Sequence, residues 1–195
     1  TLVLAPATYA PQFFKEIAAS VFYVENWALA LDAVDYLAAE NAASPVQHFW
    51  TLSVEEQFYL VWPLIALGAA LVAMRVGARV RVVVAVAVGL VFGVSLAWSA
   101  ALVGSGSSFS YFGTHVRAWE FATGALVAIV AARLGLARRL PRAASWLGVA
   151  VILSSVMLFS SSTPFPGIAA LFPVMGAALV VSADSDGSSW SPGGL

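Results

Sequence analysis

The stretch His48–Ile65, HFWTLSVEEQFYLVWPLI, decides the fold class of this chain. It begins with polar groups, passes through paired carboxylates and aromatic residues, and runs directly into a hydrophobic segment that is too long for a helix of a soluble core. A helix needs roughly 20 apolar residues to cross a bilayer. We therefore expect a membrane-spanning helix whose mouth carries a histidine and two glutamates.

The composition of the whole chain agrees with this expectation. Of the 195 residues, 61% are hydrophobic and only 10% are charged, and the mean hydropathy is +0.91. Soluble domains are about half apolar and about a quarter charged, so the composition is that of a polytopic membrane protein. The net charge of −1 gives no reason to expect a nucleic-acid partner. The absence of cysteine excludes disulfides, thiolate metal sites and a cysteine nucleophile.

Hydropathy predicts an all-α membrane bundle of about six transmembrane helices. Four segments are clear spans, a fifth is short, and a first one is weaker because Glu25 and Asn26 lie inside it. In chain order they are Phe13–Leu31, Phe58–Met74, Val82–Val103, Phe121–Leu134 extended back to Val116, Trp146–Phe159 and Ile168–Ser182. Residues 1–183 would form this domain and residues 184–195 a polar cytoplasmic loop or linker. The chain starts without Met inside an apolar phrase, so we expect it to be a piece of a longer protein.

The arginines predict the orientation of the bundle. They cluster in two loops separated by two spans, so both loops lie on one side, which the positive-inside rule makes cytoplasmic. By alternation Lys15 falls on the same side, and Arg117 is the one basic residue outside. The two clusters are Arg75, Arg79 and Arg81, and Arg133, Arg138, Arg139 and Arg142.

The mouth of the second predicted span has two interpretations. If the helix begins near His48, then His48, Leu52, Glu55 and Tyr59 share one face, and Glu56 is rotated away by about 100°. An imidazole above a carboxylate can exchange protons with it. Alternatively, the aromatic residues form an interfacial belt and the glutamates are merely hydrated or placed at a helix start. The residues alone favour neither interpretation.

A second polar group lies at the mouth of a later span. Arg117 and Glu120 are i, i+3 neighbours, so a direct ion pair is easy to form, and Gly124 one turn below would let a ligand or helix approach closely. The pair is either a structural salt bridge or a site that holds an anionic or carbonyl oxygen, and we favour the second use. We expect His115 to be an exposed loop histidine. With His48 far from it in sequence, we expect no metal site.

These phrases resemble those of the integral-membrane acyltransferases of the type-3 family. The resemblance rests on the His48–Pro63 phrase, on Arg117-Ala-Trp-Glu120 followed by Gly124, and on Pro166-Gly167 with Leu171-Phe-Pro173. Asn26-Trp27 is similar to a weaker phrase of the family. Thr51 stands where serine is usual and keeps the hydroxyl. The phrases occur in the order and at the spacing of the family, over almost the whole chain.

The resemblance implies the function. Such proteins transfer an acyl group, often acetyl from acetyl-CoA, to a hydroxyl of an extracytoplasmic carbohydrate or similar acceptor, in the bacterial cytoplasmic membrane. No bound cofactor is implied, and acyl-CoA is a donor substrate. The partners implied are membrane lipids, acyl-CoA and the hydroxyl acceptor. The family's histidine belongs to an Arg/Lys-x10-His phrase that this sequence does not contain.

By resemblance, Glu55, Arg117 and Glu120 are the predicted catalytic residues. Glu55 would orient the family's histidine, and Arg117 with Glu120 would shape the acceptor or donor site. The predicted substrate-binding residues are His48, Trp50, Tyr59 and Trp119. A transporter or flippase of a polar or glycosidic substrate is the alternative, because polar residues inside a membrane also mark substrate pathways.

Overall fold

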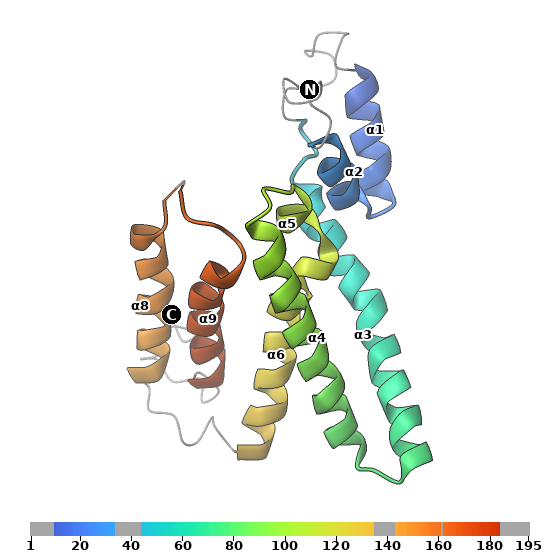
Figure 1. Ribbon diagram of the computed structural model, residues 1–195, viewed down its shortest axis with the longest axis vertical. Coiled ribbons are helices and arrows are strands. Elements are labelled where there is room, and N and C mark those ends of the chain that lie inside the picture. Colours follow the sequence, from blue (N-terminus) through green and yellow to red (C-terminus); the bar gives the residue numbers. More distant parts are fainter. Residues whose placement is uncertain (1–9, 34–43, 135–142, 161, 184–195) are drawn as a thin grey trace.

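A computed structural model describes residues 10–33, 44–134, 143–160 and 162–183, and every regular element in these ranges is helical (Figure 1). The prediction of an all-α fold is therefore confirmed. In chain order the elements are α1 (Ala10–Val21), α2 (Glu25–Asp32), α3 (Phe49–Val76), α4 (Val80–Val103), α5 (Phe109–Phe112), α6 (Thr114–Leu134), α8 (Ala143–Leu158), the 3-10 turn η3 (Ile168–Ala170) and α9 (Leu171–Ala183).

Helices α3 and α4 are, within the described ranges, the two that have the length and composition to cross a membrane; α8 and the η3–α9 unit are shorter apolar helices. At 1.5 Å per residue α3 is roughly 42 Å long, against a hydrocarbon thickness of about 30 Å. The predicted span Phe58–Met74 lies inside α3, which begins earlier, at Phe49. The polar first turns of α3 therefore extend beyond the apolar part of the same helix.

A small core joins α3, α4 and α6. Val54 and Phe58 of α3 are buried with Ala118 of α6, and partly buried residues pack around them: Trp50, Trp62, Val91 and Phe121. Helix α9 lies beside α6, and α8 packs against α9 on the far side (Figure 1). Gly148 and Gly176 face each other where α8 meets α9: a Cβ on Gly148 would lie 2.5 Å from the carbonyl oxygen of Gly176. Small residues thus let these two backbones touch.

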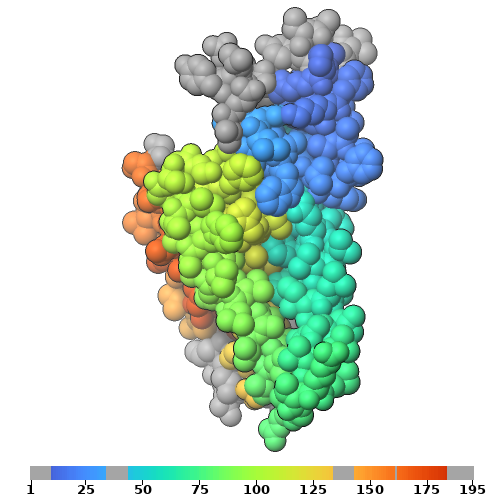
Figure 2. Space-filling view, turned by 45° about the vertical axis from the view of Figure 1, so that its right-hand side comes forward, coloured from blue at the N-terminus to red at the C-terminus, as the bar shows by residue number. Residues whose placement is uncertain are grey.

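The predicted first span, Phe13–Leu31, is wrong. The helix stops at Val21, Tyr23 takes a left-handed conformation (φ 55°), and the chain reverses into the eight-residue α2. An ion pair between Lys15 of α1 and Asp32 of α2 joins the two arms of this hairpin. The hairpin is stacked above the N-terminal end of α3 (Figure 2).

The two ends of the bundle differ in charge. Arg75, Arg79 and Arg81 lie at the α3–α4 turn, and Arg133 at the end of α6 lies at the same end of the molecule, as predicted (Figure 1). Lys15 lies at the opposite end, so its predicted place beside the arginines is wrong. Residues 138–142 and the predicted linker 184–195 lie outside the described residues.

Candidate active site

The Arg117–Glu120 pair forms at the start of α6, as its spacing predicts. Arg117 donates from Nε (3.0 Å) and from Nη2 (2.7 Å) to the same oxygen, Oε2 of Glu120. Both side chains are half-buried. Because the two bonds share Oε2, the Oε1 atom of Glu120 and the Nη1 group of Arg117 carry no hydrogen bond within the described part of the chain. The pair therefore keeps a donor group, Nη1, and an acceptor atom, Oε1, for a ligand.

Gly113 sets the start of α6. Its φ of −68° is ordinary, but an added Cβ would lie 2.6 Å from the carbonyl oxygen of Phe109 and 2.8 Å from the His115 ring. Only a residue without a side chain fits this tight joint between α5 and α6. The joint places the first turn of α6, which carries Arg117, directly after the aromatic residues of α5.

The Arg117 guanidinium lies on a ring of an aromatic cluster formed by Trp50, Tyr111 and Phe112. Trp50 from the first turn of α3 lies 5.2 Å from Tyr111 and 5.3 Å from Phe112, measured between ring centroids. The Arg117 Cζ atom lies 5.3 Å from the Trp50 ring centroid, a cation–π contact. Of the predicted substrate-binding residues, Trp50 is the one that the structure brings to the Arg117–Glu120 pair.

Gln57 connects three segments beneath the aromatic rings. Its Nε2 donates to the Tyr23 carbonyl (2.7 Å) and to Asn26 Oδ1 (2.9 Å). Its Oε1 accepts from Thr114 Oγ1 (2.5 Å) and from Trp27 Nε1 (3.2 Å).

Asn26 closes this network. It is fully buried and donates from Nδ2 to Thr114 Oγ1 (2.9 Å) and to the Phe112 carbonyl (3.0 Å). Helical spacing pointed to Glu55 in α3 and gave no signal for Gln57, whose partners Asn26 and Trp27 belong to a phrase of the family resemblance. The network fixes α2, the start of α3 and the start of α6 relative to one another.

A cavity of about 250 Å³ lies between α6 and α9 and reaches Glu120. Its lining residues are Glu120, Thr123, Gly124 and Val127 from α6, and Val174, Ala177, Ala178 and Val181 from α9. Thr123 turns its hydroxyl back to the Trp119 carbonyl (2.8 Å), so Glu120 is the charged group in an otherwise apolar lining. A Cβ on Gly124 would meet nothing within 4 Å. The missing side chain at this position leaves open space, not a helix contact.

The predicted face is present at the start of α3, and all four of its side chains are exposed: His48, Leu52, Glu55 and Tyr59. The direction of this face differs by roughly 110°, from the helix period, from the direction of the buried residues Val54 and Phe58. The structure therefore does not bring Glu55 to the Arg117–Glu120 pair. Both groups lie toward the same end of the bundle, on different surfaces.

Two further residues differ from their expected settings. Trp119 is fully buried, lies edge-on to Phe92 and donates its backbone N–H to Ser95 Oγ (3.0 Å), which is a packing position between α4 and α6. The expectation of an exposed His115 is wrong: its ring is half-buried, stacked on Trp27 at 5.7 Å and edge-on to Trp98 at 5.0 Å. Across the described ranges, no three His, Asp or Glu side chains gather as metal ligands would.

Comparison with known proteins agrees with this arrangement. A sequence model of the acyltransferase domain matches residues 12–191. The chain belongs to the acyltransferase type-3 family. It is similar to peptidoglycan O-acetyltransferase OatA of Listeria monocytogenes, at 30% identity over 135 residues, which are 66% of this chain and 21% of that protein. It is also similar to O-acetyltransferase OatA of Staphylococcus aureus, at 40% identity over 65 residues, 33% of this chain and 10% of that protein.

The chain thus spans about a fifth of the length of the Listeria relative. No solved structure matches it. Three phrases of this acyltransferase domain meet at one end of the bundle: Asn26-Trp27, the start of α3 and the start of α6 are joined by the Gln57 network. Three of the phrases that carry the resemblance, Asn26-Trp27, the start of α3 and the start of α6, are therefore also neighbours in space.

Proposed function

We propose that the complete protein is a multi-pass O-acyltransferase of the bacterial cytoplasmic membrane. It would transfer an acyl group, in the first instance acetyl, from acyl-CoA to a hydroxyl of an extracytoplasmic carbohydrate such as peptidoglycan. Family membership and the names of the Listeria and Staphylococcus relatives support the reaction class and the acceptor. The observation that carries the proposal is the Arg117–Glu120 pair at the head of an apolar cavity.

The reaction defines what this pair would do. The acceptor oxygen attacks the thioester carbonyl, the new C–O bond forms as the C–S bond breaks, and the hydroxyl proton ends on the departing thiolate. Negative charge develops on the carbonyl oxygen, and a fixed guanidinium stabilises such charge better than water does. Arg117 has a free Nη1 group for that oxygen, and Glu120 holds the guanidinium in place while Oε1 accepts a hydrogen bond from the acceptor hydroxyl.

The cavity suits the acyl group. An acetyl methyl needs apolar walls and exclusion of water, so that the thioester is transferred and not hydrolysed. Gly124 lies one turn below Glu120 and leaves the space open, and the α9 wall is made of alanine and valine. A Cβ at Gly124 would enter this space without meeting any atom within 4 Å.

Glu55 lies on a different surface from the Arg117–Glu120 pair. With His48 and Tyr59 it lies on an exposed face of α3. We propose that Glu55 orients the family's histidine, which lies in a phrase that is not in this sequence. The Arg117–Glu120 pair would then bind the reacting groups, and Glu55 would act through the histidine as a positioning residue.

The proposal is tested by following labelled acetyl groups. Membranes that contain the full-length protein are incubated with radiolabelled acetyl-CoA, and base-labile label is counted in peptidoglycan. Label that depends on the gene, and that appears only when acetyl-CoA reaches the face with the arginine loops, supports the proposal. Transport of an unmodified glycan without label in it would favour a transporter or flippase and overturn the proposal.

A further inference from the structure

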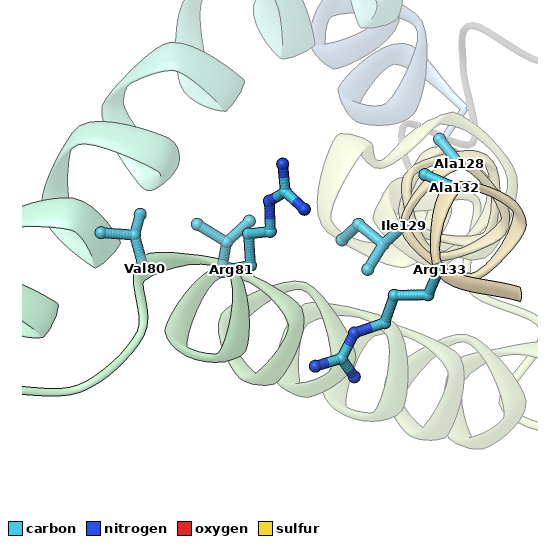
Figure 3. A pocket seen from close by; sticks show the side chains of 7 residues that line it. Val80, Arg81, Ala128, Ile129, Ala132 and Arg133 are labelled. Atoms are coloured by element: carbon cyan, nitrogen blue, oxygen red, sulfur yellow. The ribbon is translucent and has the colours of Figure 1, made fainter.

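A second cavity lies at the opposite end of the bundle from the Arg117–Glu120 pair. It occupies about 380 Å³ between the start of α4 and the end of α6. Five of its seven lining residues are apolar: Val80 and Val84 of α4, and Ala128, Ile129 and Ala132 of α6. The other two are Arg81 and Arg133, one on each helix (Figure 3).

The two guanidiniums have no acidic partner within the described ranges of the chain. Arg81 and Arg133 are exposed, and neither takes part in an ion pair with a described residue. The acidic residues within the described ranges all lie toward the other end of the molecule: Glu16, Glu25, Asp32, Glu55, Glu56 and Glu120. Two exposed cations on one groove, with no acidic partner among the described residues, can bind an anion.

The position of the groove relative to the membrane indicates which kind of anion it would bind. Arg81 is the second residue of α4, a helix of roughly 36 Å whose apolar length matches the hydrocarbon layer, so its guanidinium lies at headgroup level. Arg133 is the last residue but one of α6 and lies at the same level. About one turn further along each helix from the arginines, the groove is lined by the apolar side chains of Val84 and Ile129. Its chemistry changes from cationic to apolar over the distance at which a phospholipid changes from phosphate to acyl chain.

We propose that this groove is a binding site for an anionic phospholipid. The side chains of Arg81 and Arg133 extend in opposite directions in Figure 3, and both would turn toward the headgroup phosphate. The first methylenes of an acyl chain would lie on Val84 and Ile129. The small side chains of Ala128 and Ala132 leave room for the glycerol group. Basic pockets between helix ends on the positive side of a bundle have the chemistry that such lipids require. The ligand would join α4 to α6 at the end farthest from the core of Val54, Phe58 and Ala118.

Native mass spectrometry of the full-length protein tests the proposal. The protein is taken from vesicles of equimolar phosphatidylglycerol and phosphatidylcholine, and the retained lipid is measured. We expect wild type to retain phosphatidylglycerol preferentially. Removing each arginine should reduce this retention about fivefold, and Arg81→Gln with Arg133→Gln should abolish the preference. The matched control is Arg75→Gln with Arg79→Gln, which removes the same charge at the same end outside the groove.

Two outcomes would overturn the proposal. The first is equal retention of phosphatidylglycerol by the groove variant and the control variant, since bulk positive charge would then explain the binding. The second needs no variant: displacement of phosphatidylglycerol from wild type by excess coenzyme A would identify a soluble phosphate compound as the ligand. Failure of acyl transfer would leave both measurements interpretable, because neither depends on the reaction at Arg117.

Discussion

The two sides of the first turns of α3 have different surroundings. One side carries Trp50 and Gln57, which contact Arg117, Asn26 and Thr114 from two other helices. The other side carries His48, Glu55 and Tyr59, and all three are exposed. Both sides carry residue types that occur in binding or catalytic sites. The difference shows that a shared helix face can be found from spacing, whereas the partner of that face depends on segments far away in the chain.

The largest effect on stability is expected on the covered side, at Gln57. Replacing Gln57 with Leu removes hydrogen bonds to Tyr23, Asn26 and Thr114 and leaves the buried amide of Asn26 partly unpaired. We expect a loss of about 3 kcal/mol in the free energy of unfolding. The matched control is Glu56→Leu on the neighbouring residue, with a small effect. Denaturant unfolding of the full-length protein measures both, and equal losses would show that the network does not stabilise the fold.

Gly148 and Gly124 differ in the same way: Gly148 is covered by a neighbouring helix, whereas Gly124 faces open space. Gly148 touches α9, so Gly148→Val forces α8 and α9 apart, and we expect a loss of about 2 kcal/mol. Gly124 faces open space, so Gly124→Val should change stability by less than about 0.5 kcal/mol. The same Gly124 variant should slow acyl transfer because its side chain enters the cavity. A stability loss at Gly124 as large as that at Gly148 would mean that the cavity between α6 and α9 is closed.

The stability of the α1–α2 hairpin should depend on pH. Glu25 lies outside the membrane-spanning helices and is fully buried. Burial, and then the nearby Glu16 carboxylate, raise the pKa of Glu25 from 4.5 to about 7. The folded hairpin therefore holds a proton that the unfolded chain releases between these pH values. Its stability is greatest at or below pH 4.5 and falls as the pH rises through 7.

Hydrogen exchange at pH 5 and pH 8 measures this dependence. The amides of α1 and α2 should exchange faster at pH 8 in the full-length protein, after correction for intrinsic rates. Glu25→Gln should remove the difference, because a glutamine stays neutral at both pH values. The control Glu56→Gln should keep it. Equal protection of wild type at both pH values would show that Glu25 ionises in the folded hairpin as it does in water.

The smallest effect on stability is expected on the open side of α3. Glu55 is exposed, so Glu55→Gln should change the free energy of unfolding by less than about 0.5 kcal/mol. If Glu55 orients the family's histidine, the same variant should still lower acyl transfer about tenfold or more, within the range of general acid–base effects. Stability and transfer are measured on one preparation. A variant with unchanged transfer would remove Glu55 from the proposed reaction.

Hydropathy and residue spacing predicted the features that depend on a single helix. Hydropathy located α4 almost to the residue, and the i, i+3 spacing predicted the ion pair of Arg117 and Glu120. Hydropathy could not predict the reversal at Tyr23, because a window average of Phe13–Leu31 contains no information on backbone direction. The hydropathy span Phe58–Met74 covers only the apolar part of α3, whose polar first turns begin at Phe49, close to the helix start near His48 on which the shared face was predicted.

Contacts between segments could not be predicted from spacing. Asn26, Gln57 and Thr114 are far apart in the sequence and meet only because α2 folds back onto the starts of α3 and α6. The cavity at Glu120 likewise needs α9, which arrives from the other end of the chain. The family resemblance indicated that these phrases belong together, and the structure adds which side of each helix faces the others.

The central claim is that the Arg117–Glu120 pair binds the reacting groups of acyl transfer. The most direct test is the rate of acetyl transfer by full-length protein that carries Arg117→Ala, with Arg75→Ala at the far end of the bundle as the matched control. We expect the Arg117 variant to insert normally and to lose about 100-fold or more in rate, while the Arg75 variant keeps the wild-type rate. Transfer at the wild-type rate by a normally inserted Arg117→Ala protein would contradict the claim.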